Sequence, residues 1–238
     1  ALAADESGKP EAWLVLEAEP GAGLYLGFCD GVGRADVERC LATAASLERL
    51  MNFVPVSAGD AFVIEAGTVH AIGKGVTLVE PQLVRPGRRG LTYRYWDWNR
   101  RYDADGLPDA GGAPRELHVQ RSLEVTSWQA PRGAAFVASC RGTQQPIAAT
   151  GGIVRTHEVD WRWFGVERWR GSGDTTIAAC DTLWALTCVG GSAELRGHTG
   201  ALRLRRGQSG VVPAAAGAIT LTGHGCDVIA TRCQPDGA

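Results

Sequence analysis

The chain has 238 residues, of which 45% are hydrophobic and 21% are charged, and its formal net charge at neutral pH is -2. This length allows either one large domain or two smaller domains with separate cores. The charge provides no basic field for a nucleic-acid backbone, and no apolar run reaches the roughly 18 residues that a membrane span needs. Because the N-terminus lacks the layout of a secretory signal, we expect a soluble cytoplasmic protein without nucleic-acid or membrane partners.

The first part of the chain predicts a β-rich unit with a helical insert. Residues 12–28 alternate apolar and polar positions around a Pro-Gly-Ala-Gly turn, which predicts a hairpin of two strands. Residues 34–50 carry apolar side chains at spacings of three and four, which predicts two short helical pieces. Further strands, separated by Gly or Pro turns, are expected at residues 53–56, 61–64, 69–72, 76–79 and 92–98.

The rest of the chain predicts a loop, a short helix and a second β-rich unit. Asp, Gly and Pro dominate residues 102–114, which indicates a surface loop, and residues 115–125 follow with a helical pattern. After about residue 130, beginning with AAFVAS at 134–139, short β-rich runs recur with glycine-rich joints, as is typical of a sandwich or barrel. We therefore divide the chain into residues 1–130 and 131–238.

A degenerate repeat connects the two units. The segment GDAFVIEAGTVHAI at 59–72 returns as GQSGVVPAAAGAI at 207–219. A glycine, a short β-rich run, a tight turn and a further apolar residue, used twice, indicate two related β-barrel units. His70 of the first copy corresponds to Ala218 of the second, so only the first unit keeps a histidine that can bind a metal. We therefore expect the chemistry in the N-terminal half and a second unit without metal.

Histidine and cysteine placement narrows the candidate site. His70 begins a strand just beyond a turn, where a jelly-roll barrel points a side chain into its mouth; a hydrogen-bonded core histidine is the alternative. The other four histidines show no ligand spacing, and we expect them to be structural or exposed. Seven irregularly spaced cysteines form no CxxC pair. We expect buried free thiols, with a disulfide between Cys226 and Cys233 as the alternative.

Three further blocks carry a family resemblance. They are EAWLVLEAEPGAGLYLGF at 11–28, LTYRYWDWNRR at 91–101 and PRELHVQRSLEV at 114–125, and they flank the block that holds His70. Together the blocks resemble the core of the type I mannose-6-phosphate isomerases, a family of zinc-dependent bicupins. The resemblance implies an all-β fold of two jelly-roll (cupin) barrels with a short helical insert in the first, which holds the catalytic site.

The resemblance also implies one zinc ion. Members of the family bind it with a Gln-x-His pair, the glutamate of a Gly-Lys-x-Glu-x-Trp segment and the histidine of Gly-Thr-Val-His-Ala. Glu11 and His70 match the last two, and we expect them to be ligands; a solvated edge residue is the alternative for Glu11. The Gln-x-His pair is missing, and the chain begins at Ala1 without a methionine, which suggests an incomplete N-terminus. Two ligands alone hold zinc poorly, since catalytic sites use about three.

One departure from the cupin pattern lies beside His70. Glu65 precedes the Ala-Gly turn at the position where cupins usually carry a proline. A proline would pre-set this turn, so its absence costs rigidity but removes no ligand.

Arg94 and Glu80 are the expected catalytic residues. The resemblance assigns Arg94 to the active site, where a guanidinium can stabilise an enediolate or bind a sugar phosphate; a salt bridge with Asp97 is the alternative. Glu80 follows His70 by ten residues and matches a glutamate of the family's cleft. It is a candidate for moving a proton from C2 to C1 of the sugar, and a salt bridge with Arg94 is its alternative.

Basic residues near the expected barrel rim suggest a phosphate site. Lys74 and Arg88 lie in Gly- and Pro-rich loops, and Arg88 is flanked by Arg85 and Arg89. We expect Arg88 and Lys74 to bind the substrate's phosphate group, with a solvated basic loop as the alternative.

The resemblance therefore implies an aldose–ketose isomerase that interconverts mannose 6-phosphate and fructose 6-phosphate with zinc as its cofactor. Two alternatives are open from the sequence. One is a catalytically inactive cupin that binds a sugar phosphate as a regulatory or binding module. The other is a metal-dependent cupin dioxygenase, although that chemistry usually needs more imidazole ligands than His70 alone.

Overall fold

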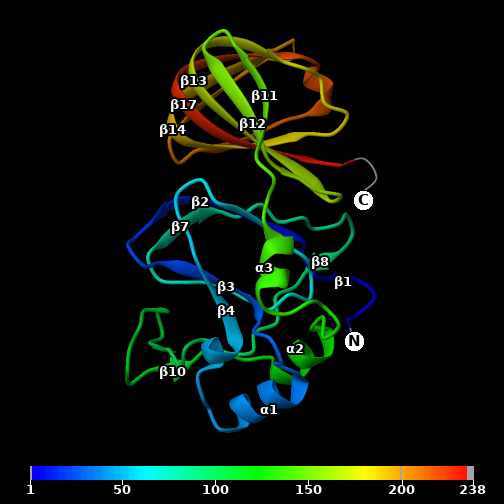
Figure 1. Ribbon diagram of the computed structural model, residues 1–238. Coiled ribbons are helices and arrows are strands. Elements are labelled where there is room, and N and C mark those ends of the chain that lie inside the picture. The colour runs from blue at the N-terminus through cyan, green and yellow to red at the C-terminus, as the bar shows by residue number, and fades with distance from the viewer. Residues whose placement is uncertain (1, 199, 235–238) are drawn as a thin grey trace.

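The computed structural model describes residues 2–198 and 200–234 and shows two β-rich units, joined by a short helical connection (Figure 1). The all-β expectation is confirmed, because strands dominate both units and helices are few and short. No helix in the described part of the chain is long and apolar enough to cross a membrane.

The first unit is built from two small antiparallel sheets. One has the strand order β5-β2-β7, and the other has the order β4-β3-β6. The strands are β2 (Glu11–Ala18), β3 (Gly23–Phe28), β4 (Met51–Pro55), β5 (Ala61–Ile64), β6 (His70–Ile72) and β7 (Val76–Val79). All of them lie within one or two residues of the strands expected from the sequence.

The turn between β2 and β3 does not close a hairpin, so that expectation is wrong. β2 pairs with β5 and β7, whereas β3 pairs with β4 and β6. The chain therefore crosses from one sheet to the other at this turn. The reason is burial: Trp13 and Val15 from β2 share one core cluster with Leu24 and Leu26 from β3, which places the two strands face to face.

The helical insert is confirmed as two pieces, α1 (Arg34–Ala42) and the 3-10 helix η1 (Leu47–Leu50). Asp36 accepts a hydrogen bond from the backbone N–H of Gly33 at 2.9 Å, which satisfies a donor at the start of α1. Val37 and Leu47 are buried in one cluster with Phe28 and Tyr95, so the insert covers one end of the first unit.

Residues 92–98, expected to form a strand, are irregular instead. Trp98 and Asn99 have φ values of 51° and 53°, which a strand does not allow. Short strand pairs flank this segment: β1 (Glu6–Ser7) with β8 (Arg89–Gly90), and β9 (Arg101–Tyr102) with β10 (Ala113–Pro114). The exposed loop inside the second pair and the helix α2 (Val119–Val125) agree with expectation.

The helix α3 (Gly133–Cys140) occupies a segment that was expected to be a strand, so this expectation is wrong. Phe136 and Cys140, one helical turn apart, are both buried in the core of the first unit. Because α3 packs on the first unit, we propose that the domain boundary lies after Cys140, some ten residues beyond the division at 130 and 131.

The second unit is a single seven-stranded sheet with the order β11-β12-β13-β17-β14-β15, in which β16 also pairs with β14. Its elements are β11 (Gln145–Thr150), β12 (Ile153–Asp160), β13 (Phe164–Ile177), β14 (Trp184–Gly197), β15 (Gly200–Arg205), β16 (Ser209–Val212), the 3-10 helix η2 (Ala214–Ala216) and β17 (Ile219–Cys233). Three of these strands are longer than the short runs expected. They bend at register shifts beside glycines and enclose a core of their own.

The repeat corresponds to matching elements, β5 to β6 in the first unit and β16 to β17 in the second. Among the described residues, the cysteines are all free. Cys226 and Cys233 lie seven residues apart on one extended strand, which is far too great a separation for a disulfide.

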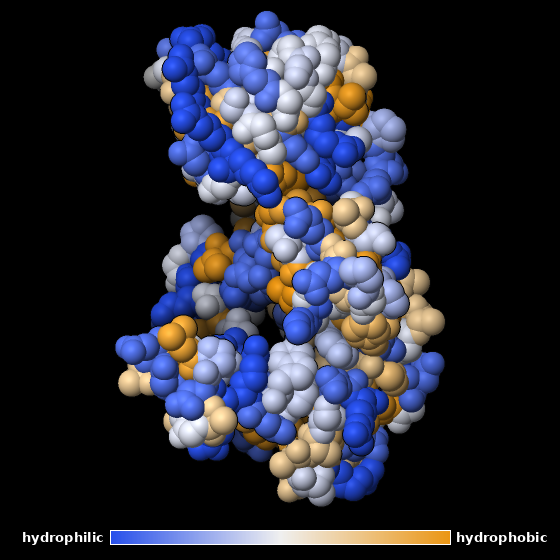
Figure 2. Space-filling model, turned by 90° about the vertical axis from the view of Figure 1, so that its left-hand side faces the viewer, coloured by the Kyte–Doolittle hydropathy of each residue, from blue (hydrophilic) through white to orange (hydrophobic). Residues whose placement is uncertain are grey.

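A shared apolar cluster joins the two units. The cluster contains Ala12, Leu14 and Ala61 of the first unit and Val159 and Phe164 of the second. In Figure 2, hydrophobic residues gather at the narrow middle of the molecule where the two units meet, which we call the waist.

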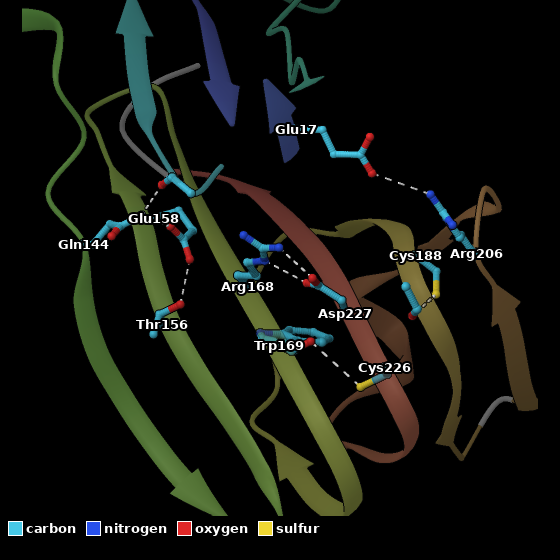
Figure 3. A network of polar contacts seen from close by, with 12 residues as sticks. Glu17, Gln144, Thr156, Glu158, Arg168, Trp169, Cys188, Arg206, Cys226 and Asp227 are labelled. Carbon is cyan, nitrogen blue, oxygen red and sulfur yellow. Dashed lines mark hydrogen bonds and ion pairs between the residues drawn. The ribbon is translucent and has the colours of Figure 1, made fainter. Parts of the chain in front are cut away.

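Polar contacts across the waist add to this interface. The side-chain amide of Gln144 donates to the carbonyl of Gly59 in the first unit, and Arg206 approaches Glu17 at 3.9 Å (Figure 3). Within the second unit, Gln144 also donates to Glu158 at 2.7 Å.

Removing the side chain of Phe136 tests whether α3 belongs to the first core. Phe136→Ala should lower the free energy of unfolding by about 3 kcal/mol, because the side chain is 8% exposed and leaves a cavity. Urea denaturation followed by circular dichroism measures this. The control Val154→Ala, at a side chain that is 45% exposed, should change it by less than about 0.5 kcal/mol. Equal effects of both substitutions would contradict the packing of α3.

Candidate active site

Strand ends bring three metal-capable side chains together. Glu11 begins β2, His70 begins β6, and Glu80 directly follows β7. One ligand atom from each lies within 4.8 Å of the other two, and this is the one such group among the described residues. Because β2 and β6 belong to opposite sheets, the cluster depends on the way in which the two sheets face each other. All three members belong to the first unit.

The backbone fixes the orientation of His70. Its Nδ1 lies 2.8 Å from the carbonyl oxygen of Thr68. A carbonyl can only accept, so Nδ1 carries the proton, and Nε2 of the neutral ring keeps its lone pair. Nε2 in turn lies 3.3 Å from Oε2 of Glu11. Metal-binding histidines commonly show this arrangement, with one nitrogen held by a carbonyl and the other free for a ligand bond.

Glu11 presents an unsatisfied oxygen to His70. The residue is 4% exposed, and its buried Oε2 has no hydrogen-bond partner among the described residues. Its other oxygen lies 3.5 Å from Nζ of Lys9. A carboxylate oxygen and an imidazole lone pair at 3.3 Å repel each other unless a proton or a cation lies between them.

A proton can occupy this position in the absence of metal. Burial raises the pKa of Glu11, but contact with a protonated His70 outweighs it and holds the pKa below its usual value. For His70, burial lowers the pKa, but Glu11 and the Thr68 carbonyl outweigh it and raise the pKa overall. A cation and a proton therefore compete for the space between Glu11 and His70, because a metal binds only the neutral imidazole.

Glu80 completes the cluster and is held by Trp13. The indole Nε1 of Trp13 donates to Oε1 of Glu80 at 2.9 Å, and the Trp13 ring packs edge-on against His70 at a centroid distance of 5.3 Å. Burial, together with the neighbouring Glu11, raises the pKa of Glu80. A raised pKa makes a carboxylate a stronger base for proton transfer.

The cluster opens into a cavity of about 710 Å³. Arg94, the expected catalytic arginine, lines this cavity. No carboxylate in the described part of the chain lies within ion-pair distance of its guanidinium, and Asp97 contacts Arg100, Arg115 and Tyr102 instead. The structure therefore supports neither of the salt bridges that were alternatives for Arg94, the one with Asp97 or the one with Glu80.

The structure does not bring Lys74 and Arg88 to the cavity. Both side chains are exposed, and neither lines it. The reason is that their loops run along the outside of the unit. Arg89, the neighbour of Arg88, pairs with Asp5 at 2.8 Å and with Glu6 at 3.1 Å.

Other cations line the cavity in their place, and they are residues that the sequence analysis missed: Lys9, Arg100 and Arg115. Lys9 had a detectable signal, because it stands two positions before Glu11 on an extended segment and so shares its side. Arg100 and Arg115 had none, since their tertiary contacts, including those with Asp97, place them at the cavity.

Aromatic residues also line the cavity, including Tyr25, Trp96 and Trp98. Tyr25 and Trp98 both donate to Oε2 of Glu48 in η1, at 3.3 Å and 3.2 Å. The combination of a metal-capable cluster, unpaired basic charge and aromatic surface suits a small, polar, anionic ligand.

Comparison with known proteins first identifies the fold class of the chain. Residues 154–232 match the family model described as the mannose-6-phosphate isomerase cupin domain. A crystal structure of the mannose 6-phosphate isomerase from Bacillus subtilis superposes with a TM-score of 0.75 at 22% identity, over 95% of this chain and 65% of that one. A fructose-6-phosphate- and zinc-bound structure from Salmonella typhimurium gives 0.58 at 15% identity, over 94% and 66%. The fold is that of a cupin.

Sequence similarity then indicates which cupins the chain resembles. The mannose-6-phosphate isomerase of Streptococcus mutans is 27% identical over 208 residues, which cover 87% of this chain and 59% of the relative. ManA of Bacillus subtilis is 25% identical over 222 residues, which cover 92% and 63%. The resemblance of the chain to cupin-type mannose-6-phosphate isomerases is thus confirmed. The chain spans about three fifths of the length of these relatives.

A conservative substitution tests the cluster as a cation site. Glu11→Gln removes the negative charge beside His70 but keeps the shape of the side chain, and it should weaken binding of a divalent cation at least tenfold. Equilibrium dialysis with zinc measures the affinity. The control Glu116→Gln alters a side chain that is 86% exposed and outside the metal-capable cluster, and it should leave the zinc affinity unchanged. Unchanged affinity of the Glu11 variant would contradict the assignment.

Proposed function

We propose that this chain carries the catalytic core of a zinc-dependent isomerase that interconverts mannose 6-phosphate and fructose 6-phosphate. The observation that carries the proposal is the buried, unpartnered Oε2 of Glu11 facing Nε2 of His70 at 3.3 Å. Relatives that align with most of the length of this chain are named mannose-6-phosphate isomerases. A location in the cytoplasm fits the free cysteines, which reducing compartments maintain.

The donor set fits zinc. An imidazole nitrogen and carboxylate oxygens are ordinary zinc ligands at about 2.0–2.2 Å, and ligand atoms around one such ion stand roughly 3.3 Å apart. The distance from Glu11 to His70 already has this value, and Glu80 is close enough to join them. We assign Glu11 and His70 as ligands. When bound, zinc would orient the sugar oxygens or polarise them towards proton loss.

We assign the proton transfer to the carboxylate of Glu80. An aldose becomes a ketose when a base removes the proton from C2 and returns it to C1 by way of an enediolate. One oxygen of Glu80 accepts a hydrogen bond from Trp13, which orients the carboxylate. Its raised pKa favours reversible protonation, and its position beside the two ligands would place the base next to the oriented sugar carbons.

We assign Arg94 to binding either the negative charge that develops during the reaction or the phosphate group of the substrate. Because no carboxylate in the described residues neutralises its guanidinium, its paired N–H donors are available to an anion in the cavity. The role of Arg88 and Lys74 in phosphate binding stays a prediction, and the cavity offers Lys9, Arg100 and Arg115 as nearer cations.

Metal removal tests the whole proposal. Mannose 6-phosphate isomerase activity should vanish after treatment with EDTA and return when zinc is added. His70→Ala should abolish both zinc retention and turnover. A folded protein that binds the sugar phosphate but is inactive in every metal state would instead identify a binding module, and a folded protein that binds no zinc would refute the assignment of the cofactor.

Two arginine variants separate the candidate anion contacts. Arg94→Ala should lower kcat/KM by about 100-fold, because loss of a buried charge-assisted contact costs roughly 2–3 kcal/mol, while zinc content stays unchanged. Arg88→Ala should lower it by less than about twofold, since this exposed side chain does not line the cavity. Steady-state kinetics with metal analysis measures both. A larger loss in the Arg88 variant would return the phosphate site to the loop expected from the sequence.

A further inference from the structure

We infer that the second unit positions the metal ligand His70 through Glu65, and that Trp163 and Arg162 are the positioning residues. The inference rests on the cation site of the proposed function but not on its reaction. It assigns a task to a unit that has no metal-capable cluster of its own among the described residues.

The first link is the turn that carries His70. The backbone N–H of Thr68 donates to the carbonyl of Glu65 at 3.1 Å, which closes a four-residue turn. The carbonyl of Thr68 then accepts from Nδ1 of His70 at 2.8 Å. The position of this carbonyl decides which nitrogen of the ring carries the proton and where Nε2 points. Any rotation of the turn would move Nε2 away from Glu11.

The second link is the side chain of Glu65, which reaches into the second unit. Nε1 of Trp163 donates to its Oε2 at 3.1 Å, and the guanidinium of Arg162 pairs with its Oε1. Both partners lie in the turn between β12 and β13. The carboxylate thus receives two donors from a segment almost 100 residues away in the sequence, and both of its oxygens are engaged.

Trp163 is itself fixed in place. Its ring packs against the apolar cluster that joins the two units. The guanidinium carbons of Arg162 and Arg85 lie 4.9 Å and 5.0 Å from the ring centroid, so two cations contact the indole. The Arg162 pair alone is weak, since its side chains are 65% and 41% exposed, and the indole contact therefore supplies the rigid part of the anchor.

The opposite side of the turn is held by the first unit. The carbonyl of Gly67 accepts from the backbone N–H of Ser127 at 2.9 Å. Gly67 has φ of 86°, and a Cβ there would lie 2.6 Å from Oγ of Ser127, so only glycine allows this approach. The turn contains no proline to pre-set its backbone. Its conformation therefore depends on these contacts from both sides.

Three variants test the inference through zinc affinity. Trp163→Phe keeps the ring but deletes the N–H donor, and Glu65→Ala deletes the acceptor. Each should weaken zinc binding about tenfold, the lower end of the effect of outer-shell partners. Glu65→Gln keeps one acceptor oxygen and should recover part of the loss. Trp161→Phe is the matched control, because Trp161 lies in the same turn but packs on Phe164, and it should stay within twofold of wild type.

A second readout needs neither metal nor activity. In zinc-free protein, at a pH at which His70 is neutral, nitrogen NMR reports the fraction of His70 that carries its proton on Nδ1. This fraction should fall in Trp163→Phe and Glu65→Ala and stay unchanged in Trp161→Phe. If Trp163→Phe does not fold, Glu65→Ala decides, since the Glu65 side chain is only half-buried.

The outcomes separate the inference from the proposed function. Wild-type zinc affinity and an unchanged His70 tautomer in folded Glu65→Ala would overturn the inference. Loss of affinity in a protein that shows no isomerase activity would uphold the inference while the proposed function fails. If the wild-type chain binds no zinc, the NMR fraction alone decides.

Discussion

The candidate site depends on a single close approach, that of the buried Glu11 carboxylate to the imidazole of His70. At 3.3 Å, with Nδ1 already committed to a carbonyl, this pair is stable only with a positive charge between or on its members. Burial of a carboxylate without a partner is costly, and a protein that places one here gains a strong preference for a proton or a metal ion. The surrounding cavity then supplies basic and aromatic groups around that charge.

The fold supports this approach from two directions. Within the first unit, β2 and β6 belong to facing sheets that share one core, so their first residues meet. Across the waist, the second unit contributes Val159 and Phe164 to a shared cluster and anchors Glu65 near the same turn. A unit that carries Ala218 at the position corresponding to His70 can therefore still contribute to the site of its partner.

Much of this was accessible from the sequence, and the failures have physical reasons. Short β-rich runs between Gly or Pro turns located β5 and β7 without error, because the flanking turn residues mark where each strand begins and ends. Alternation cannot say which strand is the neighbour, so the turn between β2 and β3 was taken for a hairpin. α3 was missed because its small and apolar residues satisfy a strand as well as a helix, and only the core beneath Phe136 decides between them.

The site residues also fall into those that a sequence motif pointed to and those that no local pattern could show. Glu11, His70, Glu80 and Arg94 were chosen through the family motifs, and the structure brings all four to one cavity. Arg88 and Lys74 were chosen by charge alone, and charge on a loop does not reveal the direction in which the loop runs. The contact of Glu65 with Trp163 joins residues 98 positions apart, and no local pattern could have shown it.

The most direct test of this account is an anomalous-difference map at the zinc edge from crystals of the zinc-loaded protein. The account predicts one strong peak within about 2.2 Å of both Glu11 and Nε2 of His70, at the mouth of the cavity. A peak bound elsewhere, or a fully loaded protein in which the two side chains still contact each other with no metal between them, would contradict it.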